Sequence, residues 1–165
     1  MEILGVDPGT SVTGFGIVSQ SNYKLQLVDY GAVRTDASDP MEQRLLRIYR
    51  AISGLVESHD IAAVAVEKLF FNKNVQSAMM VGQARGVIML AAASGGVPVL
   101  EYTPQQVKVA VTGHGAAPKK QVQAMVQSVL GMHETPSPDD AADGLALAVC
   151  GLHRWEWDRR LGAET

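Results

Sequence analysis

Two carboxylic acids stand at the ends of apolar stretches that have the pattern of buried β-strands. These acids are Asp7 and Glu67. Two more, Asp140 and Asp143, begin a segment rich in alanine and leucine, and their spacing places both on one face of a helix. Carboxylates that a fold gathers into a cluster are stable mainly when they bind hard divalent cations. The sequence therefore predicts an active site that holds metal ions through these four acids.

Each acid also has an ordinary structural explanation. Asp7 lies in an Asp-Pro-Gly sequence that is common in turns. Asp140 suits a helix N-cap, and Asp143 suits a first helical turn, where the helix dipole favours negative charge. Asp139 is a cap or a neighbour of the site, because the Asp-Ala-Ala-Asp spacing favours Asp140 as the ligand. Glu67 is harder to explain, since a lone acid after six apolar residues needs solvent, a base or a cation.

Gly9 and Gly14 follow Asp7 in the pattern Asp-x-Gly-(x)4-Gly, which leaves space beside the acid. The same pattern can hold a nucleotide phosphate in actin-like or sugar-kinase ATPases. Those proteins need two such domains, and a chain of 165 residues has room for one. The chain also lacks a Gly-x-x-x-x-Gly-Lys-Ser/Thr loop and a Gly-x-Gly-x-x-Gly turn. A nucleotide site is therefore the weaker interpretation.

A sheet with helices on its faces is expected to position the acids. Strand patterns cover residues 2–6, 14–19, 25–34, 61–69 and 97–102. Helical patterns cover residues 41–58, 75–94, 104–111, 118–130 and 138–154. The first three strands suit an antiparallel meander, and the fourth has the apolar composition of a strand buried on both faces. The order predicts an α/β fold with a five-stranded mixed sheet flanked by helices on both faces, and a site at the ends of the first and fourth strands.

The composition is that of one ordinary globular domain, with 47% hydrophobic and 19% charged residues. No run approaches the roughly 18 apolar residues of a membrane span, and the N-terminus has no signal-like pattern, so we expect a cytoplasmic protein without membrane contact. The single cysteine, Cys150, is expected to be buried and without chemistry. We expect one domain over residues 1–154 and a tail over 155–165, whose Trp155 and Trp157 receive no role.

Positive charge is concentrated in the middle of the chain. The whole chain has a net charge of −3, but residues 68–133 contain six basic side chains and one acidic side chain. Phosphate binding depends on local rather than total charge, so this segment predicts a cationic face beside the acidic site. An ordinary solvated surface is the alternative, and the salt dependence of binding distinguishes the two.

Four motifs resemble those of the RuvC-type Holliday junction resolvases of bacteria, from residue 1 to about 153. They are Ile3-Leu4-Gly5-Val6-Asp7-Pro8-Gly9-Thr10, Val66-Glu67-Lys68-Leu69-Phe70, Gly82-Gln83-Ala84-Arg85-Gly86 and Asp140-Ala141-Ala142-Asp143-Gly144-Leu145-Ala146. The resemblance implies a ribonuclease H-like fold and an endonuclease that nicks four-way DNA junctions symmetrically in recombination and DNA repair. A nucleotide-handling or nucleic-acid-binding module that does not cut junctions is the alternative.

The resemblance also implies the cofactor and the roles of the acids. The family's four catalytic carboxylates fall on Asp7, Glu67, Asp140 and Asp143. They would hold two Mg2+ ions, or Mn2+, at the separation of about 3.5 to 4 Å that suits one phosphodiester. Asp7 would bridge both ions, and cleavage would leave a 5′ phosphate and a 3′ hydroxyl. A branch-migration complex resembling RuvA and RuvB is the expected partner.

Two adjacent aromatic residues, Phe70 and Phe71, share a polar loop with Lys73, and all three are expected to bind DNA. Both rings cannot easily be buried there, so one is expected to stack on unpaired bases at the junction centre. The family position favours Phe70.

Three lysines are expected to contact the DNA backbone: Lys108, Lys119 and Lys120. Lys119 falls on the family's basic position near the cut site. His114, in a Gly-His-Gly sequence, is expected to be a surface loop residue.

The helix expected over residues 75–94 is apolar on more than one face. Such a helix is either central in the core or covered by a second subunit. The resemblance implies a homodimer, whose two-fold symmetry would match that of a four-way junction.

Overall fold

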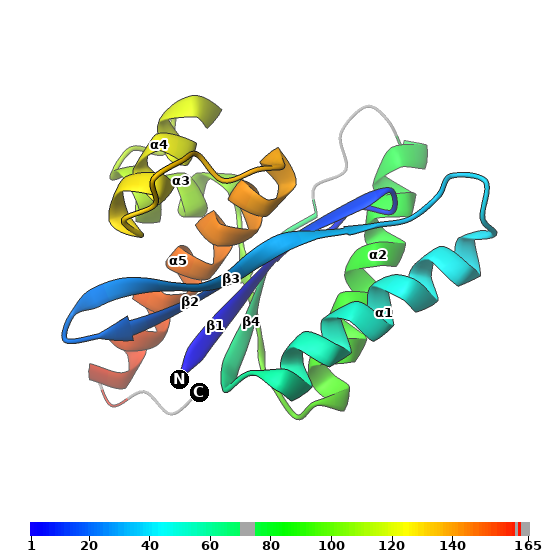
Figure 1. Cartoon of the computed structure of the whole chain (residues 1–165), viewed down its shortest axis with the longest axis horizontal. Helices are drawn as coiled ribbons and strands as arrows, with labels where there is room; N and C mark the ends of the chain where they lie inside the picture. The colour runs from blue at the N-terminus through cyan, green and yellow to red at the C-terminus, as the bar shows by residue number, and fades with distance from the viewer. Residues whose placement is uncertain (70–74, 161, 163–165) are drawn as a thin grey trace.

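A sheet of five strands separates two layers of helices in the computed structural model (Figure 1). The structure describes residues 1–69, 75–160 and 162, without the side chains of 158–160. The strands are β1 (Glu2–Asp7), β2 (Val12–Ser21), β3 (Lys24–Arg34), β4 (Ile61–Glu67) and β5 (Val99–Tyr102). The helices are α1 (Met41–Ser58), α2 (Val75–Ser94), α3 (Pro104–Thr112), α4 (Lys119–Val129) and α5 (Asp139–Arg160). None of the described helices is both long and apolar enough to cross a membrane.

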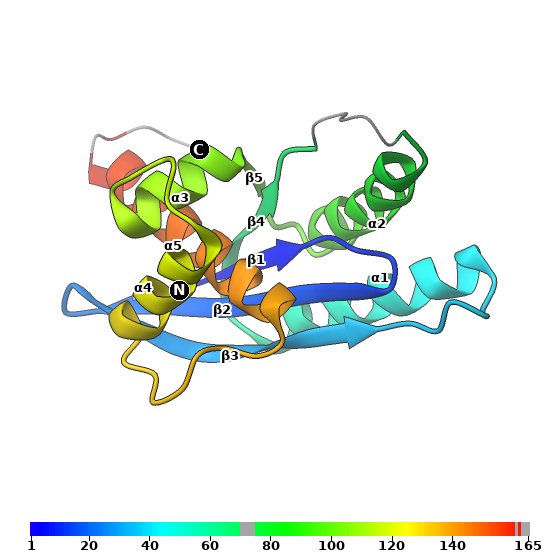
Figure 2. The same ribbon diagram turned by 90° about the horizontal axis from the view of Figure 1, so that it is seen from above.

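The sheet is mixed, with the strand order β3-β2-β1-β4-β5. The first three strands pair antiparallel, whereas β4 pairs parallel with both β1 and β5. Helices α1 and α2 lie side by side along one face, and α3, α4 and α5 cover the other, as the view in Figure 2 shows from above. The predicted α/β fold, with an antiparallel meander and a buried fourth strand, is therefore confirmed.

Side chains alternate between the two faces of the sheet along β1 and β4. Val6 packs in the core formed with α1 and α2, whereas Ile3 and Ala65 belong to the core beneath α5. Asp7 and Glu67 stand an even number of positions after Ile3 and Ala65, so they point to the side of α5. Both strands therefore end with an acid on the same face.

Helix α5 lies against the sheet backbone because glycines leave no side chains between them. Asp7 on β1 faces Gly14 on β2. A methyl group at Gly14 would lie 1.8 Å from the carbonyl oxygen of Asp140, and one at Gly5 would lie 2.1 Å from that of Gly144. No larger residue fits at these positions unless the helix moves. The first turns of α5 are thus held directly over the end of β1.

Some boundaries differ from the sequence-based expectations. The fourth strand ends at Glu67 and not at residue 69, because its neighbour β1 stops at Asp7 and is followed by Pro8, which has no N–H to continue the ladder. The fifth strand begins at Val99 rather than at residue 97.

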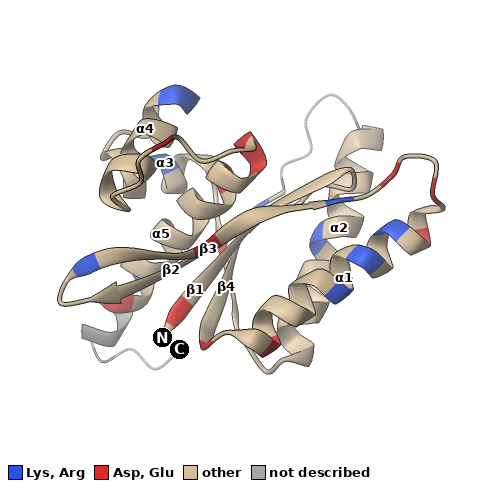
Figure 3. Cartoon of the chain, viewed as in Figure 1, with Lys and Arg blue, Asp and Glu red and all other residues tan. Residues whose placement is uncertain are grey.

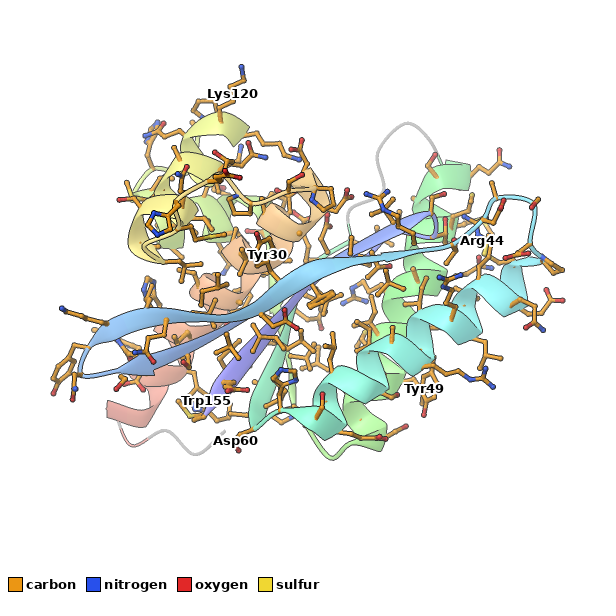
Figure 4. All side chains as sticks on the ribbon, in the orientation of Figure 1. Tyr30, Arg44, Tyr49, Asp60, Lys120 and Trp155 are labelled. Carbon is orange, nitrogen blue, oxygen red and sulfur yellow. The ribbon has the colours of Figure 1, made fainter. Side chains whose placement is uncertain are left out.

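The last helix runs six residues beyond the expected end at residue 154, to Arg160. Trp155 packs against the core beneath α5 and directs its indole N–H to the sulfur of Met1 at 3.0 Å (Figure 4), while Trp157 is exposed. The division into a domain of residues 1–154 and a tail of 155–165 stays a prediction. Cys150 is buried, as expected.

Candidate active site

A cavity of about 280 Å³ lies where β1 and β4 end beneath α3, α4 and α5. Its charged lining consists of Asp7, Glu67, Asp143, Lys108 and Lys119. The structure therefore brings together three of the four predicted acids and two of the predicted lysines, from five segments of the chain. Figure 3 shows acidic residues at the start of α5 and basic residues at the start of α4.

The fourth predicted acid, Asp140, lies one turn before Asp143 and is not part of the cavity wall. Its charge nevertheless raises the pKa of both Asp7 and Asp143 by repulsion, which places it within electrostatic reach of the cavity. The charge of the neighbouring Asp139 is among the causes that raise the pKa of Asp143 but not among those at Asp7, and its carboxylate accepts a hydrogen bond of 3.1 Å from the amide of Gln123. Asp140 thus has the closer relation to the cluster.

Burial and mutual repulsion oppose ionisation of the acids in the cavity. They raise the pKa of Asp7 from 3.8 to about 7; burial is the largest cause, and the charges of Asp143, Glu67 and Asp140 add to it. Burial, and then the charge of Asp143, also raises the pKa of Glu67. Burial raises the pKa of Asp143 despite the nearby ammonium of Lys119. A set of carboxyls with these properties is stabilised by added positive charge.

Lys119 supplies one such charge from within the chain. Its Nζ donates a hydrogen bond to Oδ2 of Asp143 at 2.8 Å and lies 3.6 Å from Oδ2 of Asp139. The hydrogen bond to Asp143 is the largest cause of a raised pKa at Lys119, so the ammonium stays protonated. The start of α4 is thereby bonded to the start of α5.

The donor chemistry of the cavity suits a hard divalent cation, because its anionic groups offer only carboxylate oxygens. The side chains are not yet close enough to hold an ion, however. Among the side chains that the structure describes, no group of three aspartate, glutamate, histidine or cysteine residues is arranged to bind one metal ion. Asp143 is bonded to Lys119 instead. The acids therefore fit Mg2+ or Mn2+ in the type of their donor atoms, and coordination requires them to approach one another more closely.

The loop after β1 is held from two sides. From within, the hydroxyl of Thr13 donates to the carbonyl oxygen of Gly9 at 2.6 Å. From α1, the buried guanidinium of Arg44 donates to the hydroxyl of Ser11 at 2.9 Å and to that of Thr35 at 3.0 Å (Figure 4). These bonds restrict the backbone that directly follows Asp7.

Of the residues predicted to bind DNA, Lys108 and Lys119 line the cavity. Lys120 is exposed on the first turn of α4 and points away from the domain (Figure 4). His114 is exposed in the loop between α3 and α4, as expected. The remaining predicted contacts fall outside the described residues: Phe70, Phe71 and Lys73.

The basic middle segment has less available charge than its sequence suggests. Arg85 forms an ion pair with Glu101, and its Nε donates to the carbonyl oxygen of Glu67 at 3.2 Å. Lys119 is bonded to Asp143. Among the described residues of this segment, Arg85 and Lys119 therefore neutralise acids of this chain, which leaves less positive charge available for a cationic face.

Sequence reasoning missed the apolar wall of the cavity. Its members are Pro104, Val107, Val122, Ala146 and Leu147. Helical periodicity held a usable signal, because Ala146 and Leu147 lie three and four positions after Asp143 on α5. No local pattern revealed the bond between Arg85 and Glu67, since it joins a helix to the end of a strand.

Comparison with known proteins gives consistent matches over nearly the whole chain. A family model described as crossover junction endodeoxyribonuclease RuvC matches residues 3–151. The protein of that name from Pelotomaculum thermopropionicum is 50% identical over 161 residues, which cover 98% of each chain. Its counterpart from Desulfitobacterium hafniense is 50% identical over 162 residues, again covering 98% of each.

A solved structure agrees with these matches. Thermus thermophilus RuvC in complex with a Holliday junction substrate superimposes with a TM-score of 0.89 and 37% sequence identity. The superposition covers 99% of this chain and 97% of that one. The similarity therefore includes all the strands and helices that surround the cavity.

Proposed function

Because this chain belongs to the RuvC family of crossover junction endodeoxyribonucleases, we propose that it resolves Holliday junctions by hydrolysing phosphodiester bonds at symmetric positions. The observation that carries the catalytic part of the proposal is the convergence of Asp7, Glu67 and Asp143 on one cavity. The cavity also contains two lysines, so it offers anionic groups for metal ions and cationic groups for phosphate.

The four acids Asp7, Glu67, Asp140 and Asp143 are the proposed ligands of two Mg2+ or Mn2+ ions. When bound, the ions would lower the pKa of the attacking water and stabilise the departing 3′ oxygen. Asp7 interacts electrostatically with each of the other three acids, which favours it as the ligand shared by both ions. Its burial beneath α5 limits access of bulk water to that carboxylate.

The lysines of the cavity are proposed to bind phosphate groups of the DNA. Lys119 keeps the charge of Asp143 balanced in the free protein, and a metal ion at Asp143 would free its ammonium for the scissile phosphate. Lys108, on the α3 side of the cavity, and the exposed Lys120 on α4 are proposed to contact further phosphates of the DNA backbone. Stacking of Phe70 or Phe71 on junction bases, and a phosphate contact of Lys73, stay predictions.

We propose that helix α2 forms the interface of a homodimer. One of its faces is buried against α1 and the sheet, yet Met79 is 61% and Leu90 58% exposed. The exposed positions Met79, Gln83, Gly86, Leu90 and Ala93 alternate in steps of four and three residues. This spacing forms one continuous stripe along a helix and suits packing against a second copy across a two-fold axis. Cooperation with partners resembling RuvA and RuvB stays a prediction, as does a location in the cytoplasm.

The alternative of a nucleotide-handling or nucleic-acid-binding module without junction cleavage is not favoured. Relatives about half identical to this chain over nearly its full length are crossover junction endodeoxyribonucleases. The ligand acids of the proposed mechanism are also all present.

The decisive experiment is incubation of the protein with a labelled mobile four-way junction and Mg2+, beside a linear duplex of the same sequence. We expect paired nicks at symmetric positions in the junction, with 5′ phosphate ends, and an intact duplex. Binding of the junction without any nick over a range of Mg2+ and Mn2+ concentrations would refute the proposed function.

A further inference from the structure

The carbonyl oxygen of Glu67 receives no backbone hydrogen bond from the neighbouring strand β1. The N–H of Lys68 donates to the carbonyl of Tyr102 on β5 at 2.8 Å, so the backbone groups of Glu67, the preceding residue, point toward β1. In the register that pairs β1 with β4, the next donor from β1 would be the N–H of residue 8. That residue is Pro8, which has none. The end of β4 therefore lacks one bond of a regular parallel ladder.

Arg85 supplies a donor at this point from helix α2. Its Nε–H donates to the carbonyl oxygen of Glu67 at 3.2 Å, and its Nη2 binds the carboxylate of Glu101 on β5. Glu101 faces Val66 in the sheet and so projects to the α2 side, where the guanidinium lies. One side chain thus connects the ends of two neighbouring strands to a helix.

We propose that Arg85 is a positioning residue that fixes the end of β4 and thereby places the carboxylate of Glu67 in the cavity. It acts from the opposite face of the sheet, because the Glu67 side chain points to the α5 side while Arg85 belongs to α2. The proposal extends the assigned function and rests on it, since Glu67 is a proposed metal ligand.

The surroundings of Arg85 argue against a direct contact with DNA. The side chain of Arg85 is only 19% exposed, and the carboxylate of Glu101 neutralises it within the chain. Two donors of a planar guanidinium serve two different acceptors, and a single ammonium cannot reproduce that geometry. Arg85→Lys therefore separates the two roles: it keeps the charge that a phosphate contact would need and removes the two-acceptor geometry.

The first test measures the end of β4 in the free protein, without metal or DNA. Amide hydrogen exchange is followed by NMR in the wild type, Arg85→Gln and Arg85→Lys. We expect faster exchange at Lys68, whose N–H makes the last β4–β5 bond, and unchanged exchange at Val64, whose N–H donates to Pro98 at the other end of β4. Unchanged exchange at Lys68 in both variants would overturn the proposal.

The second test separates catalysis from binding with a synthetic four-way junction. For both Arg85 variants we expect the single-turnover cutting rate at saturating protein to fall by about 10-fold to 100-fold, the usual effect of removing a group that orients a metal ligand. The junction Kd, measured without divalent ions, and its salt dependence should remain those of the wild type. Arg47→Gln is the matched control, because it removes an exposed arginine from α1 and should leave the rate unchanged.

The outcomes distinguish failure of this inference from failure of the proposed function. If Arg85→Lys cuts at the wild-type rate while Arg85→Gln loses junction affinity, Arg85 binds phosphate and the inference is wrong. If the wild type itself does not cut, the proposed function fails, and the hydrogen exchange at Lys68 still decides the role of Arg85. Should both Arg85 variants fail to fold, Glu101→Gln replaces them: we expect a smaller effect in the same direction, and no effect on exchange or rate would overturn the inference.

Discussion

Lys119 donates a hydrogen bond of 2.8 Å to Asp143, and this bond joins the first turn of α4 to the acidic start of α5. Asp143 is one of three acids on the cavity wall, so the ammonium reduces the repulsion within the whole cluster. Helix α4 therefore contributes to the chemistry of a site whose acids all lie on other elements.

We expect Lys119→Gln to lower the rate of junction cutting by about 10² at neutral pH, a usual scale for loss of one preorganised charged donor. The reason is that both the scissile phosphate and the acids lose their nearby cation. Single-turnover kinetics at saturating protein measures this rate. Lys120→Gln is the control: it removes the same charge from an exposed neighbour and should mainly weaken binding. An equal loss of cutting rate in the two variants would contradict a specific role of Lys119 in the cutting step.

Asp7→Asn is expected to abolish cutting without abolishing junction binding. The change removes ligand charge at the most central acid and leaves the lysines in place. A loss of at least about 10³-fold is expected for a group that acts as part of a catalytic unit. Gel shifts in the absence of divalent ions measure the binding. Loss of binding together with cutting would count against the assignment of Asp7 as a metal ligand.

The stability of the metal-free protein should fall as pH rises from about 4 to about 7. The pKa of Asp7 is raised from 3.8 to about 7 in the folded state, so over this range the folded protein retains a proton that the unfolded chain has released. The raised pKa values of Glu67 and Asp143 add to the same slope. Asp7→Asn should reduce the slope and be the more stable protein above pH 7, by a few kcal/mol at most.

Thermal unfolding in a chelating buffer at several pH values measures this dependence. Adding Mg2+ at pH 8 should raise the Tm of the wild type more than that of Asp7→Asn, because the ion compensates the charges that oppose folding. Parallel curves for the two proteins would show that Asp7 does not titrate in this range.

Gly14→Ala should lower both stability and cutting. The added methyl group would lie 1.8 Å from the carbonyl oxygen of Asp140, so α5 has to move away from the sheet. Overpacking of this kind costs about 1 to 3 kcal/mol, and displacement of reacting groups by about 1 Å can cost about 10² in rate. Gly54→Ala on α1 is the control, because no atom lies within 4 Å of its added methyl. It should stabilise the helix by up to about 1 kcal/mol. Tm and single-turnover rate report both effects.

Leu90→Glu is expected to convert the proposed homodimer to a monomer. Leu90 is 58% exposed on the stripe of α2 that we assign to the interface, and a charge there would be buried in the dimer. Light scattering measures the molar mass, and we expect uncoordinated single nicks in place of paired ones. Leu46→Glu changes a leucine that is 37% exposed on α1 and should leave the dimer intact. A wild-type protein that is monomeric at micromolar concentration would remove this proposal.

The sheet and the general place of the site were predictable because they follow from local patterns. The continuous apolar stretches of β1 and β4 predict that Asp7 and Glu67 end buried strands, and a spacing of three residues groups Asp140 with Asp143 on one face of a helix. The glycines at positions 5 and 14 were visible in the sequence too, but their contact with α5 depends on how the helix crosses the sheet.

The connections between distant segments were not predictable. Lys119 and Arg85 both count as basic residues in the sequence, and nothing nearby shows that one is bonded to Asp143 and the other to Glu101. Such pairs depend on which helix lies over which strand end. Whether Asp140 is part of the cavity wall depends in a similar way on how α5 crosses the sheet.

The contact of α5 with bare sheet backbone has a consequence for redesign of this protein. Asp140 and Asp143 lie on α5, and the distance of this helix from the sheet is set by contacts with main-chain atoms at Gly5 and Gly14. No side chain between helix and sheet can therefore be resized to change the distance from these acids to Asp7. Attempts to shift metal preference by resizing residues under the helix should therefore destabilise the protein and slow cutting rather than alter selectivity. A change in metal preference then requires a change in the length of the ligand side chains themselves, such as aspartate exchanged for glutamate.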